Sequence, residues 1–221
     1  MLRKEMPEPA HRQAHRHTAV VRATHWLAAL CFLALLVSGL EIVLSHPRFY
    51  WGEAGNVTTP ALFSLPVPAS RATVPTGYGF VLPDQNGWSR SLHFEAAWAV
   101  VFTGLFYVAA GLYTRHFRNN LLPAGAGAYN LAQRLTYLFV IFVAFPLAIW
   151  TGLAMSPAVA SVLPQAVSAW GGQESARTIH FFLTLFLVAF LAIHLIMITR
   201  AGFGPLVRAM ITGRTQNKER S

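Results

Sequence analysis

The chain has 221 residues, of which 54% are hydrophobic and only 11% are charged, and its mean hydropathy is +0.45. Soluble domains carry about 25% charged residues, so this composition excludes an ordinary soluble domain and indicates a membrane protein. The net charge of +9 does not indicate nucleic-acid binding, because the basic residues are concentrated in segments that flank apolar runs.

Four apolar stretches are long enough to cross a bilayer, which takes about 20 residues in a helix. They predict an all-α membrane protein, a bundle of four transmembrane helices at about residues 25–44, 93–113, 135–155 and 179–199. The first stretch is too long for the apolar part of a signal peptide, and no small-residue cleavage site follows it. We therefore expect one membrane domain, residues 21–215, in which the first helix is retained.

Residues 1–20 are polar, basic and rich in histidine, and they predict a flexible cytoplasmic arm. Metal binding by His11, His15 and His17 is an alternative, but no carboxylate or cysteine lies among residues 11–17. Cys31, the single cysteine, lies within the first helix and is expected to pack as a small apolar residue.

The basic residues also predict the topology. If the N-terminus is cytoplasmic, 13 of the 17 Lys and Arg residues lie on the inner side, as the positive-inside rule expects. Both termini are therefore predicted to be cytoplasmic, and residues 45–92 form a long outer loop. This loop is rich in Pro, Gly, Ser, Thr and aromatic residues, and it predicts either a contact surface for a partner or an interfacial cap at headgroup level.

Four of the nine histidines lie in the predicted helices, where polar side chains are costly and usually functional. His180 and His194 are fourteen residues apart in the fourth helix, so they project from nearly the same face, about 21 Å apart. His93 opens the second helix on the outer side, and His25 opens the first helix on the inner side. Pairing by depth predicts that His93 faces His180 and that His25 faces His194.

Facing imidazoles on neighbouring helices are typical axial ligands of a haem iron. Two such pairs at opposite depths predict two haems. The chain has no C-x-x-C-H motif for covalent attachment, so b-type haem is expected. A zinc or di-iron site needs more ligands at one depth, and only Glu41 and Glu95 lie near the membrane.

Glycine and arginine residues accompany these histidines. Gly39 lies fourteen residues after His25 and is predicted to allow close approach of the outer haem, as are Gly104 and Gly111 in the second helix. Helix–helix packing through small residues is the alternative. Three arginines each lie three residues before a predicted ligand and are candidates to bind haem propionates, with snorkelling to the membrane edge as the alternative: Arg22, Arg90 and Arg177.

At these residues the chain resembles the prokaryotic cytochrome b561 family. The matching segments are RATHW (22–26), SGLEIVLSHPRFYWG (38–52), LHFEAAW (92–98) and SARTIHFFLTLFLVAFLAIH (175–194). The family includes the cytochrome b subunits of nickel–iron hydrogenase and respiratory formate dehydrogenase. The resemblance implies a multi-pass protein of the bacterial inner membrane, with two haem b groups held by the four helix histidines.

The HPRFYWG segment and the ending GFGPLVRAMITGR (202–214) are similar to a thiosulfate-reductase-type branch of that family. This branch implies a periplasmic oxidoreductase partner, of the molybdopterin-dependent kind, and exchange of electrons with quinone. The analogy to formate dehydrogenase puts the quinone near the inner haem and residues 114–134, where Asn119, Asn120 and Asn130 offer hydrogen bonds. His46 and His116 are candidates for proton transfer, or are simply solvated.

Two alternatives remain open at this point. Some four-helix members of the family act alone as superoxide:quinone oxidoreductases, which require a positively charged outer funnel. The outer segments carry few basic residues, so an electron-transfer subunit of a complex is favoured over a stand-alone enzyme. A non-redox membrane transporter with structural histidines is the other alternative, and it predicts no haem spectrum.

Overall fold

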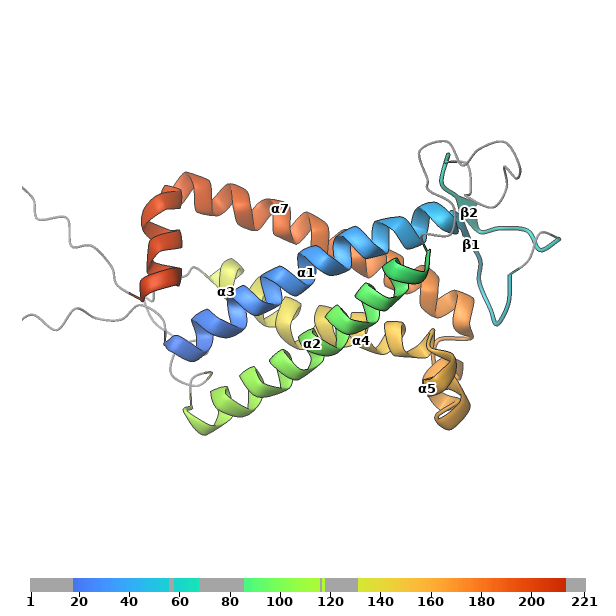
Figure 1. Cartoon of the computed structure of the whole chain (residues 1–221), viewed down its shortest axis with the longest axis horizontal. Helices are drawn as coiled ribbons and strands as arrows, with labels where there is room; N and C mark the ends of the chain where they lie inside the picture. The colour runs from blue at the N-terminus through green and yellow to red at the C-terminus, as the bar shows by residue number, and fades with distance from the viewer. Residues whose placement is uncertain (1–17, 56–57, 68–85, 116, 118–130, 214–221) are drawn as a thin grey trace, which may run out of the picture.

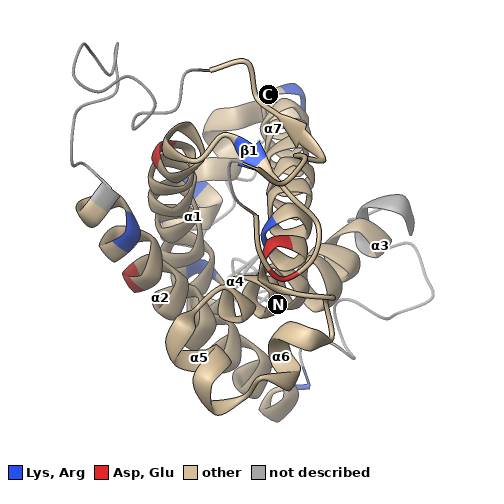
Figure 2. Ribbon diagram, turned by 90° about the vertical axis from the view of Figure 1, so that its right-hand side faces the viewer, with Lys and Arg blue, Asp and Glu red and all other residues tan. Residues whose placement is uncertain are grey.

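The structure, a computed structural model, describes residues 18–55, 58–67, 86–115, 117 and 131–213. Its long helices run side by side and form one bundle (Figure 1). The elements in chain order are α1 (Ala19–Ser45), β1 (Arg48–Phe49), β2 (Phe63–Ser64), α2 (Asn86–Tyr113), α3 (Leu131–Phe139), the π-helical turn η2 (Val140–Ala144), α4 (Phe145–Ala154), α5 (Pro157–Val162), α6 (Gln165–Ser168) and α7 (Gln173–Thr212). In end view, α1, α2, α4 and α7 surround a common interior (Figure 2).

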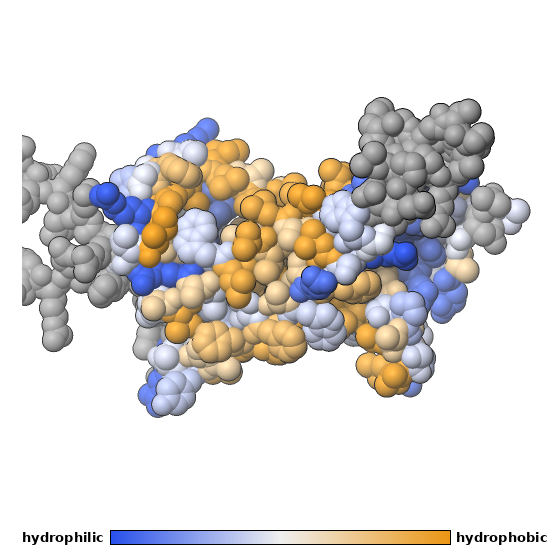
Figure 3. All heavy atoms as spheres, in the orientation of Figure 1, coloured by the Kyte–Doolittle hydropathy of each residue, from blue (hydrophilic) through white to orange (hydrophobic). Residues whose placement is uncertain are grey.

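The predicted fold class is confirmed. Within the described residues, four helical segments are long and apolar enough to cross a membrane: Ala19–Ser45, Gly87–Tyr113, Leu135–Ala154 and Gln173–Thr212. Three of them begin six residues earlier than the sequence predicted, because the polar first turns extend each helix beyond its apolar run. The surface over the middle of the helices is mostly hydrophobic (Figure 3), as lipid contact requires. The cytoplasmic location of the termini stays a prediction, and 'inner' and 'outer' below name the two ends of the bundle on that predicted topology.

Small residues form the seam between α1 and α2, the most extensive helix pair. The buried side chains of α1 recur every seven residues: Thr24, Cys31, Ser38 and Ser45. Three buried residues of α2, Ser89, Ala96 and Thr103, have the same spacing, and Val100 is buried between the last two. A seven-residue repeat of small residues lets two helices approach closely along their whole length, which favours association within a bilayer.

The third membrane span is interrupted by the π turn η2, where the N–H of Phe145 donates to the carbonyl of Val140. Pro146 follows at the start of α4. A proline has no N–H and its ring clashes with the carbonyl four residues earlier, and a π turn accommodates both defects. One extra residue in the turn rotates the following helix by about 100° and so changes the face that α4 presents to α7.

The fourth predicted helix, 179–199, is only the central part of α7. This element extends from Gln173 to Thr212 and bends sharply at Gly202, whose φ of 104° and ψ of 89° are not helical. The segment after the bend turns across the inner end of the bundle (Figure 1). There the indole N–H of Trp26 donates to the carbonyl of Met210 at 3.1 Å, so the C-terminal segment of α7 is held against α1.

The outer end of α7 is held by the loop after α1. Three hydrogen bonds of Gly52 join the two segments: its carbonyl accepts from Glu174 N (3.0 Å) and Ser175 N (3.2 Å), and its N–H donates to the side chain of Ser175, at Oγ (2.8 Å). Thr178 Oγ1 also donates to the carbonyl of Tyr50 at 2.7 Å. These contacts satisfy N–H groups that the first turn of a helix leaves free.

Aromatic packing completes this outer platform, which we define as residues 48–53 together with Phe63 and the first turns of α7. Strands β1 and β2 pair antiparallel, with Phe49 opposite Phe63. The Phe49 side chain is 1% exposed, and its ring lies 4.6 Å from that of Phe63 and 4.5 Å from that of Phe181. The long outer loop thus includes a structured part that is packed onto α7.

Gly172 provides the first stability prediction. Its φ is +122°, and a Cβ at this position would lie 2.3 Å from the backbone of Gly52. Gly172→Ala is expected to lower the unfolding free energy by about 2 kcal/mol or more, because it adds backbone strain and separates the loop from α7. Gly87→Ala is the matched control, since its Cβ would meet nothing within 4 Å. Equal thermal unfolding temperatures for the two variants in detergent would contradict this docking.

Candidate functional site

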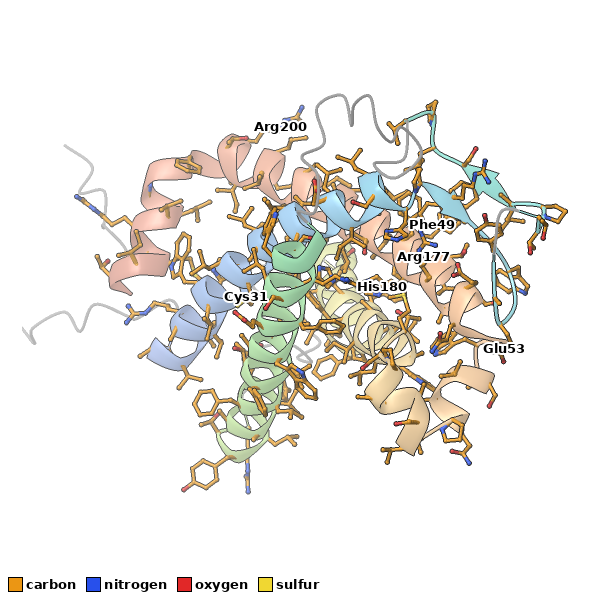
Figure 4. The ribbon with its side chains drawn as sticks, turned by 45° about the vertical axis from the view of Figure 1, so that its right-hand side comes forward. Cys31, Phe49, Glu53, Arg177, His180 and Arg200 are labelled. Carbon is orange, nitrogen blue, oxygen red and sulfur yellow. The ribbon has the colours of Figure 1, made fainter. Side chains whose placement is uncertain are left out.

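The outer histidine pair joins α2 and α7. The ring centres of His93 and His180 are 6.3 Å apart, and the rings are inclined by 67°. Figure 4 shows His180 directed into the interior of the bundle, with Arg177 and Phe49 nearer its outer end. The structure therefore brings together two histidines that are 87 residues apart in the sequence.

Each ring of the outer pair is within hydrogen-bond distance of a hydroxyl from a neighbouring helix. Ser38 Oγ of α1 lies 3.0 Å from His93 Nδ1, and Thr151 Oγ1 of α4 lies 3.0 Å from His180 Nδ1. Both hydroxyls also donate to carbonyls of their own helices, at 2.7 Å to Ala34 and 2.8 Å to Leu147.

These hydrogen bonds fit one tautomer of both rings. Each hydroxyl has a single proton, and the carbonyl of its own helix can only accept. When the proton is donated to that carbonyl, the hydroxyl oxygen accepts from the imidazole, which places the ring proton on Nδ1. Nε2 of His93 and of His180 is left with a free lone pair, as a metal ligand requires.

A glycine follows each of these hydroxyl residues and faces the same ring. A Cβ on Gly39 would lie 3.4 Å from His93 Cε1, and a Cβ on Gly152 would lie 3.5 Å from His180 Cε1. Larger side chains at either position would displace the imidazoles. Gly39 was singled out from the sequence, whereas Ser38, Thr151 and Gly152 were not. The available signal was the repeated hydroxyl–glycine pair, Ser-Gly in the first span and Thr-Gly in the third.

The other two glycines considered above lie elsewhere. A Cβ on Gly104 would meet nothing within 4 Å, and one on Gly111 would meet the ring of Phe117 at 2.4 Å. Gly111 therefore allows close packing of Phe117 in this structure.

The inner histidine pair joins α1 and α7. The ring centres of His25 and His194 are 6.4 Å apart, with the rings inclined by 49°. Aromatic side chains surround this pair: Phe190 stacks on His194 at 5.9 Å, Tyr137 lies 6.3 Å from His194, and Trp26 lies 5.4 Å from His25. The inner pair is the more open of the two, since His25 is exposed.

The separation within each pair fits a shared metal ion. Two metal–imidazole bonds of about 2 Å, with about 1.2 Å from each nitrogen to its ring centre, put the ring centres about 6 Å apart. Among the residues that the structure describes, no group of three or more His, Cys, Asp and Glu side chains could hold a metal. Two opposed imidazoles are the donor set that a haem iron takes from a protein, because the porphyrin supplies its other ligands.

The three candidate arginines differ in their surroundings. Arg22, near the inner pair, has buried Nε and Nη1 atoms with no hydrogen-bond partner among the described residues, which suits an anionic propionate. Arg177 is engaged within the chain: it bonds Glu174 at 3.1 Å, donates to the carbonyl of His46 and lies over the Phe49 ring at 4.9 Å. Arg90 is exposed.

Several candidates lie outside the described residues and stay predictions: His11, His15, His17, His116, Asn119, Asn120 and Asn130. His46 is described and exposed, next to the outer platform.

Comparison with known proteins gives two matches and one negative result. The sequence profile of the family described as prokaryotic cytochrome b561 matches residues 16–213. A relative in Azospira oryzae, the "putative protein-methionine-sulfoxide reductase subunit YedZ1", is 24% identical over 207 residues, which cover 82% of this chain and 89% of that protein. No solved structure matches.

The glycine beside His180 provides a prediction for the site. Gly152→Leu is expected to lower the haem bound per chain, because a Cβ alone already contacts the His180 ring. Gly104→Leu adds the same side chain at an open, exposed position and should bind as much haem as the parent protein. The measurement is a pyridine haemochrome assay of both purified variants, and equal haem content would contradict the prediction.

Proposed function

The chain belongs to the prokaryotic cytochrome b561 family, and from this membership we propose that it is a di-haem cytochrome b subunit that carries electrons between a periplasmic oxidoreductase and quinone. Family membership establishes a membrane cytochrome b of the bacterial inner membrane that acts in electron transport. The number of haems, their ligands, the partner and the quinone are the proposed part.

One observation carries the proposal. Two pairs of opposed imidazoles, at 6.3 and 6.4 Å, lie at two levels of one bundle. Each pair takes one histidine from α7, and the fourteen residues between His180 and His194 separate the two levels by about 21 Å of helix. His93 and His180 would hold one haem, and His25 and His194 the other.

When bound, the haems supply reversible one-electron oxidation and reduction. The chain's own residues hold and orient these groups. Ser38 and Thr151 orient the outer imidazoles, and Phe190 and Tyr137 pack against His194. The Nε and Nη1 atoms of Arg22, which have no hydrogen-bond partner among the described residues, are available to a propionate near the inner pair. Exposed apolar side chains around the bundle, among them Leu30, Phe102 and Phe106, would face lipid.

The periplasmic partner is proposed to dock at the outer platform. Residues of this platform are hydrogen-bonded to the first turns of α7, so the platform links the surface of the protein to the helix that carries His180. Trp51 is 60% exposed at this platform, and large exposed aromatic side chains are common at protein interfaces. The name of the Azospira oryzae relative describes a subunit of a putative reductase, which also supports a partner of this kind.

The quinone is proposed to bind near the inner pair. His25 is exposed there, and the rings of Trp26, Phe190 and Tyr137 offer an aromatic surface next to the two imidazoles. The flat ring of a quinone can stack against such side chains from the membrane.

The haem count tests the proposal. Protein purified in detergent is expected to contain two b-type haems per chain by the pyridine haemochrome assay and a reduced-minus-oxidised spectrum. His180→Ala and His194→Ala should each retain one haem or fewer, because each removes one imidazole of a pair. His46→Ala, an exposed histidine outside the helices, should retain two. A folded protein with no haem, or two haems in both helix variants, would falsify this assignment.

Reactions with quinone and with superoxide distinguish an electron-transfer subunit from a stand-alone superoxide:quinone oxidoreductase. The reduced protein is expected to be reoxidised by a short-chain quinone analogue without any partner. It should be reduced only slowly by superoxide, because the outer segments carry few basic residues and one of them, Arg177, is paired with Glu174. Rapid reduction by superoxide followed by transfer to quinone would instead identify a stand-alone oxidoreductase.

A further inference from the structure

We propose that Ser38 and Thr151 are positioning residues that set the reduction potential of the outer haem by accepting a hydrogen bond from each of its axial histidines. The inference rests on the proposed ligation by His93 and His180. It goes beyond ligation, because it assigns a role to two hydroxyls that contact only the far side of each imidazole.

The two hydroxyls occupy equivalent positions, each beside one histidine of the outer pair. Helices α1 and α2 pack together, as do α4 and α7, and these are the two most extensive helix pairs. In each pair, one helix carries the histidine and the other carries a hydroxyl residue followed by glycine. The distance from the hydroxyl oxygen to Nδ1 is 3.0 Å in both helix pairs. Packing alone would not be expected to repeat this arrangement in two separate pairs.

Each hydroxyl oxygen is held in a fixed position. The Ser38 and Thr151 side chains are 0% exposed, and each donates its proton to a carbonyl of its own helix. The position of each oxygen is therefore determined by a helix backbone and not by solvent. A fixed acceptor at Nδ1 also fixes the rotation of the imidazole about its Cβ–Cγ bond.

The electronic consequence has a definite direction. Donation of the Nδ1 proton to an acceptor increases electron density at Nε2 and makes the imidazole a stronger donor to iron. A stronger donor favours the oxidised, more positively charged iron. Removal of either acceptor should therefore raise the reduction potential of the outer haem and leave that of the inner haem unchanged.

The test is a potentiometric titration of the purified, haem-loaded protein with two variants of the same residue. Thr151→Val keeps the shape of the side chain and removes the hydroxyl, whereas Thr151→Ser keeps the hydroxyl. In Thr151→Val, one of the two one-electron components should move to higher potential. Its reduced-to-oxidised ratio at a fixed ambient potential should rise about threefold to tenfold, which is about 30 to 60 mV. Thr151→Ser should titrate as the parent protein does.

Ser38→Ala provides an independent variant and should move the same component in the same direction. Thr103→Val is the matched control, because Thr103 is also buried and donates to its own helix, at 2.6 Å to Ala99, without contacting a histidine. Unchanged potentials in both Thr151→Val and Ser38→Ala, with two haems bound, would overturn the inference. Equal shifts in Thr103→Val would overturn it as well.

Loss of haem is also decisive. If Thr151→Val loses one haem while Thr151→Ser and Thr103→Val keep two, the hydroxyl is needed to orient the ligand, as proposed. If Thr151→Ser loses haem equally, side-chain shape and not the hydroxyl matters, and the inference fails. These results differ from failure of the proposed ligation, in which His180→Ala would keep both haems.

The tautomer can be measured without haem. In the haem-free protein labelled with ¹⁵N-histidine, His93 and His180 should show protonated Nδ1 and unprotonated Nε2 by solid-state NMR. The Nδ1 signal of His180 should change in Thr151→Val and not in Thr103→Val. Protonated Nε2 on both rings would contradict the proposed positioning.

Discussion

The cost of an unpaired polar group in hydrocarbon constrains how this bundle can be built. Its interior contains imidazoles and hydroxyls, and each hydroxyl of the outer site satisfies two requirements at once. The proton of Ser38 or Thr151 is donated to the same helix, and the oxygen accepts from a histidine of the neighbouring helix. The helix pairs α1–α2 and α4–α7 are thus held by polar contacts as well as by small-residue packing.

Helix α7 connects the levels of the molecule. It contributes one histidine to each pair, its first turns bind the outer platform, and its bent end contacts α1 through Trp26 and Met210. Because a helix has a fixed rise, the separation of the two imidazole pairs depends on α7 alone and not on the loops. Changes on the outer side can therefore alter docking without changing the distance between the two levels.

Two of the membrane-spanning segments are not regular α-helices throughout. The π turn before Pro146 sets the face on which α4 presents Thr151, and the bend at Gly202 directs the end of α7 across the inner side. The π turn and proline leave no mark on the apolar pattern, so the sequence predicted one regular helix for this span. The β1–β2 ladder was missed for a similar reason, since two residues per strand are too few to show an alternating pattern.

The sequence by itself determined the four membrane spans and predicted which histidines face each other. Both follow from apolar length and helical periodicity, which are local properties of the chain. It also singled out Gly39, which lies fourteen residues after His25 in the first helix, close to four helical turns. Only the tertiary structure decided which side chains meet across helices. Ser38 and Thr151 are ordinary small polar residues in their own helices, and their role depends on the rotation of one helix against another. Arg177 likewise looked like Arg22 in spacing. Packing pairs Arg177 with Glu174, whereas Nε and Nη1 of Arg22 are buried without a hydrogen-bond partner among the described residues.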